Sequence, residues 1–135
     1  MKRCKEDARR WFEQAEHDLE VANSNLTLGF YADACFMSEQ AAQKALKAYL
    51  IYKGRRYVWE HSIQELAKLC MKYDKKFRDI IDAGMILDKF YIPTRYPDAL
   101  APPAVPYKSY RKEDAVEAIN ISDSIIQLVR KELKT

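Results

Sequence analysis

Residues 30–54 read FYADACFMSEQAAQKALKAYLIYKG, and this stretch decides the fold. Seven of its residues recur at alternating steps of 4 and 3, which places them on one side of a helix: Tyr31, Cys35, Ser38, Ala42, Ala45, Tyr49 and Tyr52. Alanine and leucine favour helices, and neither proline nor an internal glycine interrupts the pattern. The small side chains allow neighbouring helices to approach closely. We therefore predict a central packing helix that ends at Gly54.

Apolar patterns on both sides of this stretch predict further helices at about residues 4–28, 75–91 and 110–133. Gly29 is nearly the whole first connection, so the first two helices form a hairpin. Ser62 and Glu65 have the spacing of a capping box, which starts a short third helix. Asp74 caps the fourth helix and Pro93 ends it. We expect an all-α fold, an antiparallel up-and-down four-helix bundle with an additional short helix, as a single domain over residues 1–135.

The composition fits a globular helical protein. Hydrophobic residues make up 48% of the chain and charged residues 32%, and there are only 3 glycines. No apolar run approaches the roughly 20 residues that a membrane-spanning helix needs. The N-terminal residues are charged and lack the apolar segment of a signal peptide. The 3 cysteines are scattered, and Cys35 and Cys70 fit small core positions. We expect a cytoplasmic protein without a membrane partner.

Positive charge is concentrated directly after the central helix. Residues 53–78 contain 8 Lys or Arg against 3 Asp or Glu, whereas residues 1–52 contain 7 against 8 and residues 79–135 contain 8 against 9. Basic residues in or near this segment can form a phosphate-binding surface: Lys44, Lys47, Arg55, Arg56, Lys68, Lys72, Lys75 and Lys76. For the last four, plain solvation is the simpler explanation. A patch of this kind gives affinity for nucleic acid without a preference for any base sequence.

Several runs of the sequence resemble those of HEPN domains, small all-helical modules of prokaryotes. They are FYADA at 30–34, SEQAA at 38–42, KALKA at 44–48, HSIQEL at 61–66 and YIPTRYPDA at 91–99. The resemblance implies a fold like that of nucleotidyltransferase substrate-binding subunits. It also implies a module that binds a nucleotide or RNA and works with a small nucleotidyltransferase in a toxin–antitoxin-like pair. The broad apolar surface of the last helix can contact a second subunit, so we expect a homodimer. HEPN domains have several functions, so the fold follows more directly than the activity.

Arg56 and His61 are the candidate catalytic residues. In many HEPN domains described as metal-independent ribonucleases, an arginine precedes a histidine by four to six residues, and Arg56 or its substitute Arg55 fits that spacing. An imidazole can move a proton near neutral pH, and a guanidinium can stabilise charge on phosphorus. Tyr57 stands where those families usually have a polar residue such as Asn. In the alternative interpretation, His61 only closes the loop onto the third helix.

Tyr91, Arg95 and Tyr96 are the candidate nucleotide-binding residues, together with Arg55, Lys44 and Lys47. Aromatic rings beside a fixed guanidinium can stack a base and hold a phosphate. In the alternative interpretation, Arg95 pairs with an acidic residue such as Asp88 or Asp98, and the tyrosines belong to the core.

The sequence lacks the residues that other classes of functional site require. The chain has 2 histidines and 3 glycines, so we expect neither a metal centre, a Gly-rich phosphate loop nor a cofactor. A polymerase-type Asp pair is also absent, so the chain is not itself a nucleotidyltransferase. Three functions remain: a nucleotide- or RNA-binding module, a metal-independent endoribonuclease, and a non-catalytic dimeric interaction bundle whose broad last helix forms the dimer.

Overall fold

The structure is a computed structural model that describes residues 2–133. It contains five α-helices: α1 (Lys2–Leu28), α2 (Tyr31–Tyr52), α3 (Ile63–Met71), α4 (Arg78–Asp88) and α5 (Lys112–Leu133). Three 3₁₀ turns lie between them: η1 (Lys75–Phe77), η2 (Pro97–Ala99) and η3 (Pro106–Lys108). Within residues 2–133 there is no strand, and the predicted all-α bundle is confirmed.

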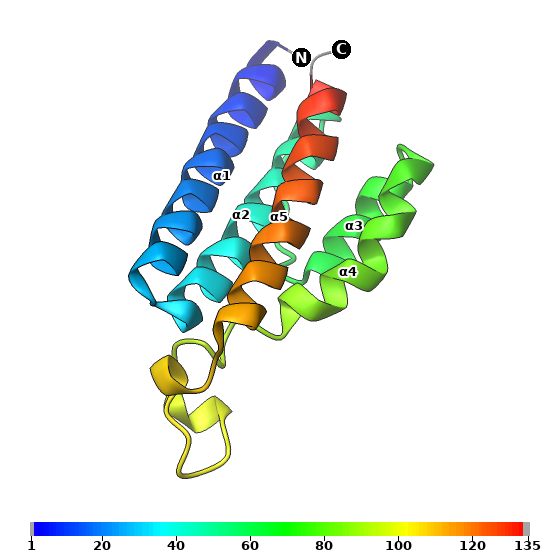
Figure 1. The fold of residues 1–135 in the computed structure, drawn as a ribbon. Helices are drawn as coiled ribbons and strands as arrows, with labels where there is room; N and C mark the ends of the chain where they lie inside the picture. Colours follow the sequence, from blue (N-terminus) through cyan, green and yellow to red (C-terminus); the bar gives the residue numbers. More distant parts are fainter. Residues whose placement is uncertain (1, 134–135) are drawn as a thin grey trace.

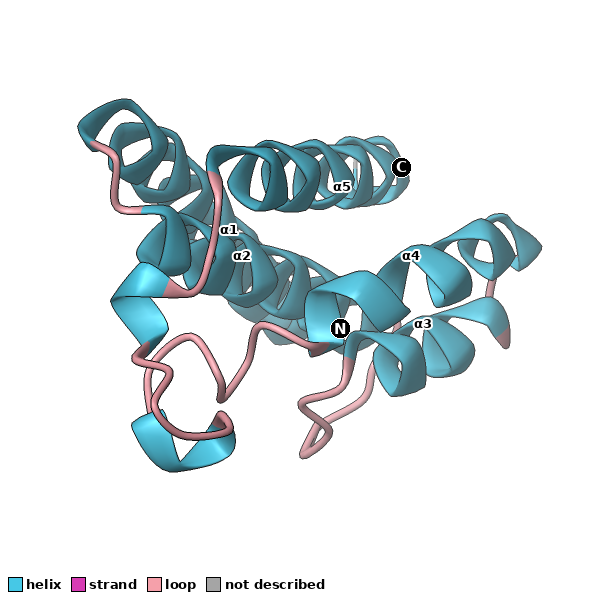
Figure 2. Ribbon diagram, turned by 60° about the horizontal axis from the view of Figure 1, so that its bottom comes forward, coloured by secondary structure: helices cyan, strands magenta, loops and turns pink. Residues whose placement is uncertain are grey.

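The three long helices α1, α2 and α5 pack side by side, and the α3–α4 hairpin packs beside them (Figure 1). Gly29 turns the chain from α1 into the antiparallel α2 with a positive φ of 83°. α5 runs in the same direction as α2, because two long connections return the chain to the end where α2 begins (Figures 1 and 2). The neighbouring helices α2 and α5 are therefore parallel, an exception to the antiparallel arrangement that the sequence predicts.

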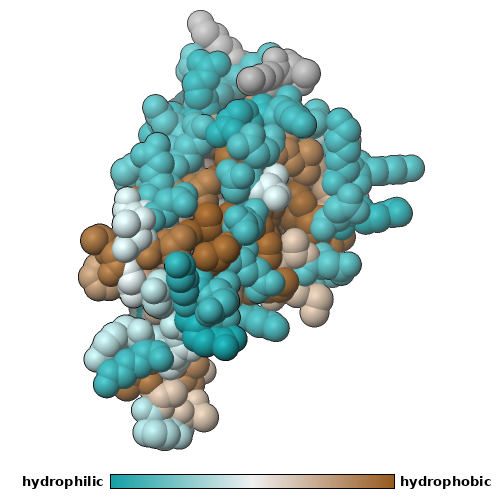
Figure 3. All heavy atoms as spheres, in the orientation of Figure 1, coloured by the Kyte–Doolittle hydropathy of each residue, from teal (hydrophilic) through white to brown (hydrophobic). Residues whose placement is uncertain are grey.

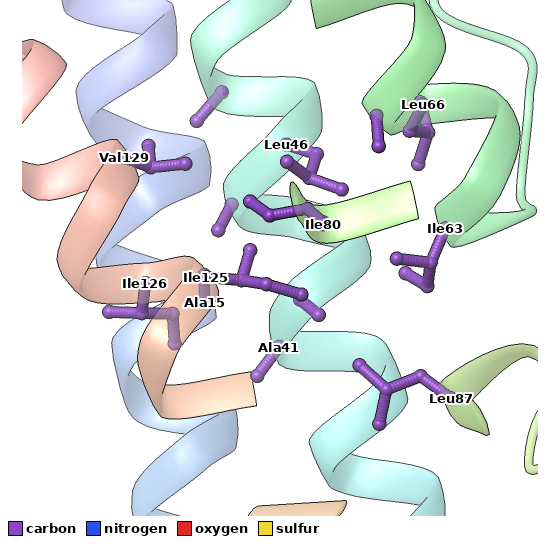
Figure 4. Packing of buried hydrophobic residues seen from close by; sticks show 14 of the residues in the cluster. Ala15, Ala41, Leu46, Ile63, Leu66, Ile80, Leu87, Ile125, Ile126 and Val129 are labelled. Atoms are coloured by element: carbon purple, nitrogen blue, oxygen red, sulfur yellow. The ribbon is translucent and has the colours of Figure 1, made fainter. Parts of the chain in front are cut away.

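Small residues on α2 allow four other helices to reach it. Ala41, Ala42 and Ala45 are completely buried, as is Leu46. Large aliphatic side chains surround them in the core: Ile63 and Leu66 from α3, Leu87 from α4, and Ile125, Ile126 and Val129 from α5 (Figure 4). Each such side chain contributes roughly 1.5–3 kcal/mol through removal of its apolar surface from water.

The first long connection, residues 53–62, is a strap that runs back along α2. Gly54 ends α2 with a φ of 100°, as the sequence predicts, and the N–H of Arg55 donates to the carbonyl of Leu50. Farther along the strap Ser62 caps α3, and its hydroxyl accepts from the N–H of Glu65 at 3.3 Å. The predicted start of α3 is thus correct.

α4 ends at Asp88 rather than at residue 91, the end that the sequence pattern predicts. Pro93 has no N–H with which to continue the helix. Side chains satisfy the carbonyl groups beyond the helix end: the Thr94 hydroxyl donates to Phe90 O, and the Arg95 guanidinium donates to Tyr91 O. Tyr91 and Arg95 therefore lie beyond the last residue of α4.

The second long connection, residues 89–111, contains all five prolines and is organised around them. Pro97 and Pro106 each begin a 3₁₀ turn, and Pro106 is buried. α5 then starts at Lys112, two residues later than expected, where Asp114 accepts from the N–H of Arg111. No helix within residues 2–133 has both the length and the hydropathy to cross a membrane.

Candidate functional site

Beneath the strap, α2 presents a buried polar row. Glu39, Gln43 and Lys47 are four residues apart and so lie on one helix face. Glu39 is 0% exposed and Lys47 is 6% exposed. A buried polar row of this kind is stable only if its groups find partners.

Glu39 and Gln43 are joined to His61 on the strap. The amide nitrogens of Gln40 and Gln43 each donate to the Glu39 carboxylate at 2.8 Å. The oxygen of the Gln43 amide therefore faces His61, and it lies 3.1 Å from Nδ1. Because an amide oxygen can only accept, Nδ1 carries the proton. The neutral ring then keeps its basic lone pair on Nε2.

The carboxyl group of Glu39 titrates near neutrality. Burial raises its pKa to about 7. The amides of Gln40 and Gln43 and the charge of Arg95 oppose this rise in pKa, whereas the charge of Asp88 adds to it. Glu39 therefore changes charge in the pH range in which a histidine also does.

Asp88, the last residue of α4, fixes the start of α3. Its carboxylate accepts from the Ser62 hydroxyl at 2.7 Å and from the backbone N–H of Ile63 at 2.5 Å. It also accepts from the N–H of Gln64 at 3.3 Å. The negative charge lies at the positive end of the helix dipole. These contacts fix the residues that directly follow His61.

At the outer edge of this network, ring-bearing and cationic side chains form a stacked cluster. The His61 ring stacks on Tyr91 with centroids 5.6 Å apart and an angle of 18°. The Arg95 guanidinium carbon lies 5.4 Å from the Tyr91 ring, 4.9 Å from the Tyr96 ring and 4.3 Å from the Phe36 ring. We call these five residues the stacked cluster; His61, Arg95 and Tyr96 are exposed.

The guanidinium of Arg95 forms no direct ion pair among residues 2–133. Its Nε and Nη2 donate to the Tyr91 carbonyl at 3.0 and 2.7 Å. Among residues 2–133 no ion pair joins it to Asp88 or Asp98, so the alternative pairing is wrong. The Asp88 carboxylate instead accepts hydrogen bonds from Ser62 and Ile63 at the start of α3. Arg95 contacts both of the predicted tyrosines, Tyr91 and Tyr96.

Lys44 and Lys47 lie away from this cluster. Lys44 pairs with the buried Asp18 of α1 at 2.5 Å. Lys47 is buried with its ammonium 5.7 Å from the Trp11 ring, and burial lowers its pKa. Lys44 joins α2 to α1, and Lys47 is buried in the polar row beside Trp11, so we leave both lysines out of the proposed site.

The remaining predicted cations lie on or after the strap. Arg55 is half-buried, whereas Arg56 is exposed and precedes His61 by five positions. Lys68 faces Glu65 at 3.9 Å and Lys76 faces Glu132 at 3.4 Å. Within residues 2–133 no group of three or more metal-binding side chains converges.

Sequence reasoning missed several members of this region, among them Phe36 of the stacked cluster. The apolar pattern assigns Glu39 and Gln43 to a packing helix, although their four-residue spacing with Lys47 is a usable signal of a polar row. Tyr57 and Trp59 fall in the predicted loop, where no pattern marks them as a pair; their rings stack nearly in parallel, 5.7 Å apart at 11°.

Comparison with known proteins gives one consistent family. The sequence model of the HEPN domain matches residues 8–132. A curated relative, "Putative toxin MJ1304" of Methanocaldococcus jannaschii, is 30% identical, and the alignment covers 94% of this chain and 88% of the relative.

Solved structures agree with this match. TT1696 from Thermus thermophilus superposes with a TM-score of 0.86 at 40% identity, over 92% of this chain and 96% of that one. ST0689, described as an archaeal HEPN homologue, gives 0.76 at 36% identity, over 93% and 97%. A HEPN domain protein of Thermotoga maritima gives 0.73 at 30% identity, over 93% and 98%. The chain therefore belongs to the HEPN domain family.

Proposed function

We propose that this chain is a nucleotide- or RNA-binding HEPN module whose stacked cluster holds the ligand. The observation that carries the proposal is Arg95, an exposed guanidinium with no ion-pair partner among the described residues, fixed between three aromatic rings. A guanidinium binds phosphate oxygens through paired hydrogen bonds. Tyr96 and His61 offer exposed ring faces beside it, on which a base can stack.

We further propose that the module works with a small nucleotidyltransferase as the toxin-like member of a toxin–antitoxin pair. Two observations support this proposal. The Methanocaldococcus jannaschii relative bears the name of a toxin. The runs at 30–48 and 91–99 resemble those of HEPN partners of nucleotidyltransferases. Co-expression and co-purification of this chain with a small nucleotidyltransferase would test the pairing, and separate elution of the two proteins would contradict it.

Calorimetric titration with AMP and ATP tests the binding site. Arg95→Ala removes the phosphate contact, and we expect affinity to fall at least tenfold, as loss of a charged hydrogen-bonding group does. Arg78→Ala is the matched control, because it removes the same charge from an exposed position on α4. Equal affinities for the wild type and Arg95→Ala would overturn the proposal.

A second candidate function is metal-independent RNA cleavage by Arg56 and His61. The observation in its favour is the fixed imidazole: Gln43 holds Nδ1, so Nε2 is left as a proton acceptor on an exposed ring. Arg56, exposed five residues earlier, would stabilise the charge on phosphorus.

Cleavage of RNA in the presence of a chelator tests this activity. We expect products with cyclic-phosphate ends, which are lost in His61→Ala and in Arg56→Ala. His17→Ala is the control, since His17 is the other histidine of the chain and lies exposed on α1. Intact RNA after incubation with excess wild-type protein would exclude the activity.

For the predicted homodimer we propose the groove between α4 and α5 as the contact. Its volume is about 740 Å³, and Ala83, Ile86, Val116 and Ile121 line it among polar residues. Apolar residues gather between α4 and α5 on the face that Figure 3 shows. Sedimentation equilibrium should show a dimer that Val116→Glu dissociates and Val105→Glu, at an exposed site in the proline-rich segment, does not. A wild-type monomer would rule this contact out.

A further inference from the structure

The strap carries an exposed pair of aromatic rings that the stacked cluster does not include. Trp59 is 76% exposed, the highest value among the large apolar side chains of the described residues, and Tyr57 is 65% exposed. Their rings lie nearly parallel at 11° with centroids 5.7 Å apart. Two neighbouring exposed rings form a contiguous apolar patch, which points to a binding role more than a singly exposed ring does.

The conformation of the strap explains why the two rings face outward together. Exposure alternates along it: Tyr57, Trp59 and His61 are exposed, whereas Val58 and Glu60 are half-buried. Val58 packs against the core. An extended chain places every second side chain on the same side. The buried positions thus anchor the strap, and the exposed ones form a single outward row.

This outward row leads directly into the stacked cluster. Trp59 and His61 are two residues apart, which separates their Cα atoms by at most about 7 Å. His61 then stacks on Tyr91, which contacts Arg95. The exposed ring pair Tyr57 and Trp59 thus lies close along the strap to His61, the first ring of the stacked cluster, and the exposed Arg56 directly precedes the pair.

We propose that Tyr57 and Trp59 form a stacking platform for single-stranded RNA that extends the nucleotide site. The proposal rests on the function proposed for the stacked cluster. One nucleotide lies at Arg95, and the bases next to it stack on Trp59 and Tyr57 while Arg56 contacts a phosphate. Single strands offer free base faces, which a duplex hides within its own stack. The preferred ligand is thus an oligonucleotide.

Tryptophan fluorescence tests the platform directly. The chain has two tryptophans, so in Trp11→Phe only Trp59 reports. A single-stranded RNA hexanucleotide should quench this signal saturably, because a stacked base quenches indole emission. AMP should bind without comparable quenching, and the same hexanucleotide in a duplex should quench weakly. Saturable quenching by the duplex equal to that by the single strand would contradict the platform.

Affinity measurements on variants give an independent readout. Trp59→Ala and Tyr57→Ala should each weaken hexanucleotide binding roughly 5-fold or more and leave AMP binding unchanged. Trp59→Phe, which keeps a ring, should lose less. Tyr107→Ala is the matched control, since Tyr107 is 68% exposed on η3. Arg56→Ala should lower the salt dependence of hexanucleotide affinity by one phosphate contact.

The outcomes separate this proposal from the one it extends. Hexanucleotide binding that depends on Arg95 but neither quenches Trp59 nor weakens in Trp59→Ala would overturn the platform and leave the nucleotide site intact. Absence of binding to both AMP and RNA would remove the nucleotide site and the platform with it. Loss of a protein partner in Trp59→Ala, with RNA affinity unchanged, would assign the rings to a protein interface and also overturn the platform.

Discussion

The two buried faces of α2 differ in what keeps them stable. Toward its neighbouring helices α2 presents Ala41, Ala45 and Leu46, which are completely buried in the core cluster and stabilised by close packing. Toward the strap it presents Glu39 and Gln43, which are stabilised by particular hydrogen-bond partners. The packed face is sensitive to volume and indifferent to pH, whereas the polar face is sensitive to protonation and to the identity of each partner. The predictions below test this difference.

The largest expected effect lies on the packed face. Leu46→Ala removes a completely buried side chain from the centre of the core, and we expect the free energy of unfolding to fall by about 2–5 kcal/mol. Urea unfolding followed by circular dichroism measures it. The loss should be the same at pH 5 and pH 8. A loss of unfolding free energy that depends strongly on pH would contradict the proposed difference between the two faces.

Glu39 gives the next largest effect, and it depends on pH. Its folded-state pKa is raised from 4.5 to about 7, so between these values the folded state binds more protons than the unfolded state. The contribution of Glu39 to stability is therefore fully present below pH 4.5 and is lost as pH rises through 7, by about 3 kcal/mol in total.

Urea unfolding of wild type and Glu39→Gln across pH 4–9 checks this sign. As the pH rises from 4.5 through 7, the wild type should lose stability relative to Glu39→Gln. The stability curve of Glu39→Gln should therefore be the flatter one. Glu13→Gln, at an exposed site on α1, is the matched control and should follow the wild type. Parallel curves for wild type and Glu39→Gln would contradict the raised pKa.

Asp88 gives a smaller effect at the boundary of the polar face. Asp88→Ala leaves the Ile63 N–H and the Ser62 hydroxyl without their acceptor, and we expect a loss of about 1–2 kcal/mol. Hydrogen exchange should show faster exchange at the start of α3. Asp98→Ala, an exposed aspartate on η2, serves as the control. Unchanged exchange at Ile63 would show that Asp88 does not cap α3.

The smallest expected effect concerns which ring nitrogen of His61 carries the proton. Because Gln43 presents its oxygen to His61, the neutral ring should carry its proton on Nδ1. Nitrogen-15 NMR above pH 8 identifies the tautomer, and Gln43→Ala should return His61 to the Nε2–H form that free histidine favours. His17 is an internal reference. An Nε2–H ring in the wild type would contradict a hydrogen bond from His61 Nδ1 to the Gln43 oxygen.

Local signals in the sequence predict most of the fold and part of the site. Gly54 and Ser62 mark a helix end and a helix start because each acts within one turn of chain. Tyr91, Arg95 and Tyr96 can be found because they lie within six residues of one another. The burial of Glu39 cannot be foreseen in this way, since it depends on how the strap returns along α2. The predicted end of α4 is wrong because side-chain groups of Thr94 and Arg95 satisfy the carbonyls beyond it.

An NMR titration with AMP tests the central claim, that the stacked cluster of His61, Tyr91, Arg95, Tyr96 and Phe36 binds a nucleotide. The chain has two histidines, one in the cluster and one exposed on α1, so each titration contains its own reference. We predict saturable shifts of the His61 ring signals, with those of His17 unchanged and with the shifts abolished in Arg95→Ala. His61 signals that stay unmoved at saturating AMP, or that shift as much in Arg95→Ala as in the wild type, would contradict the claim.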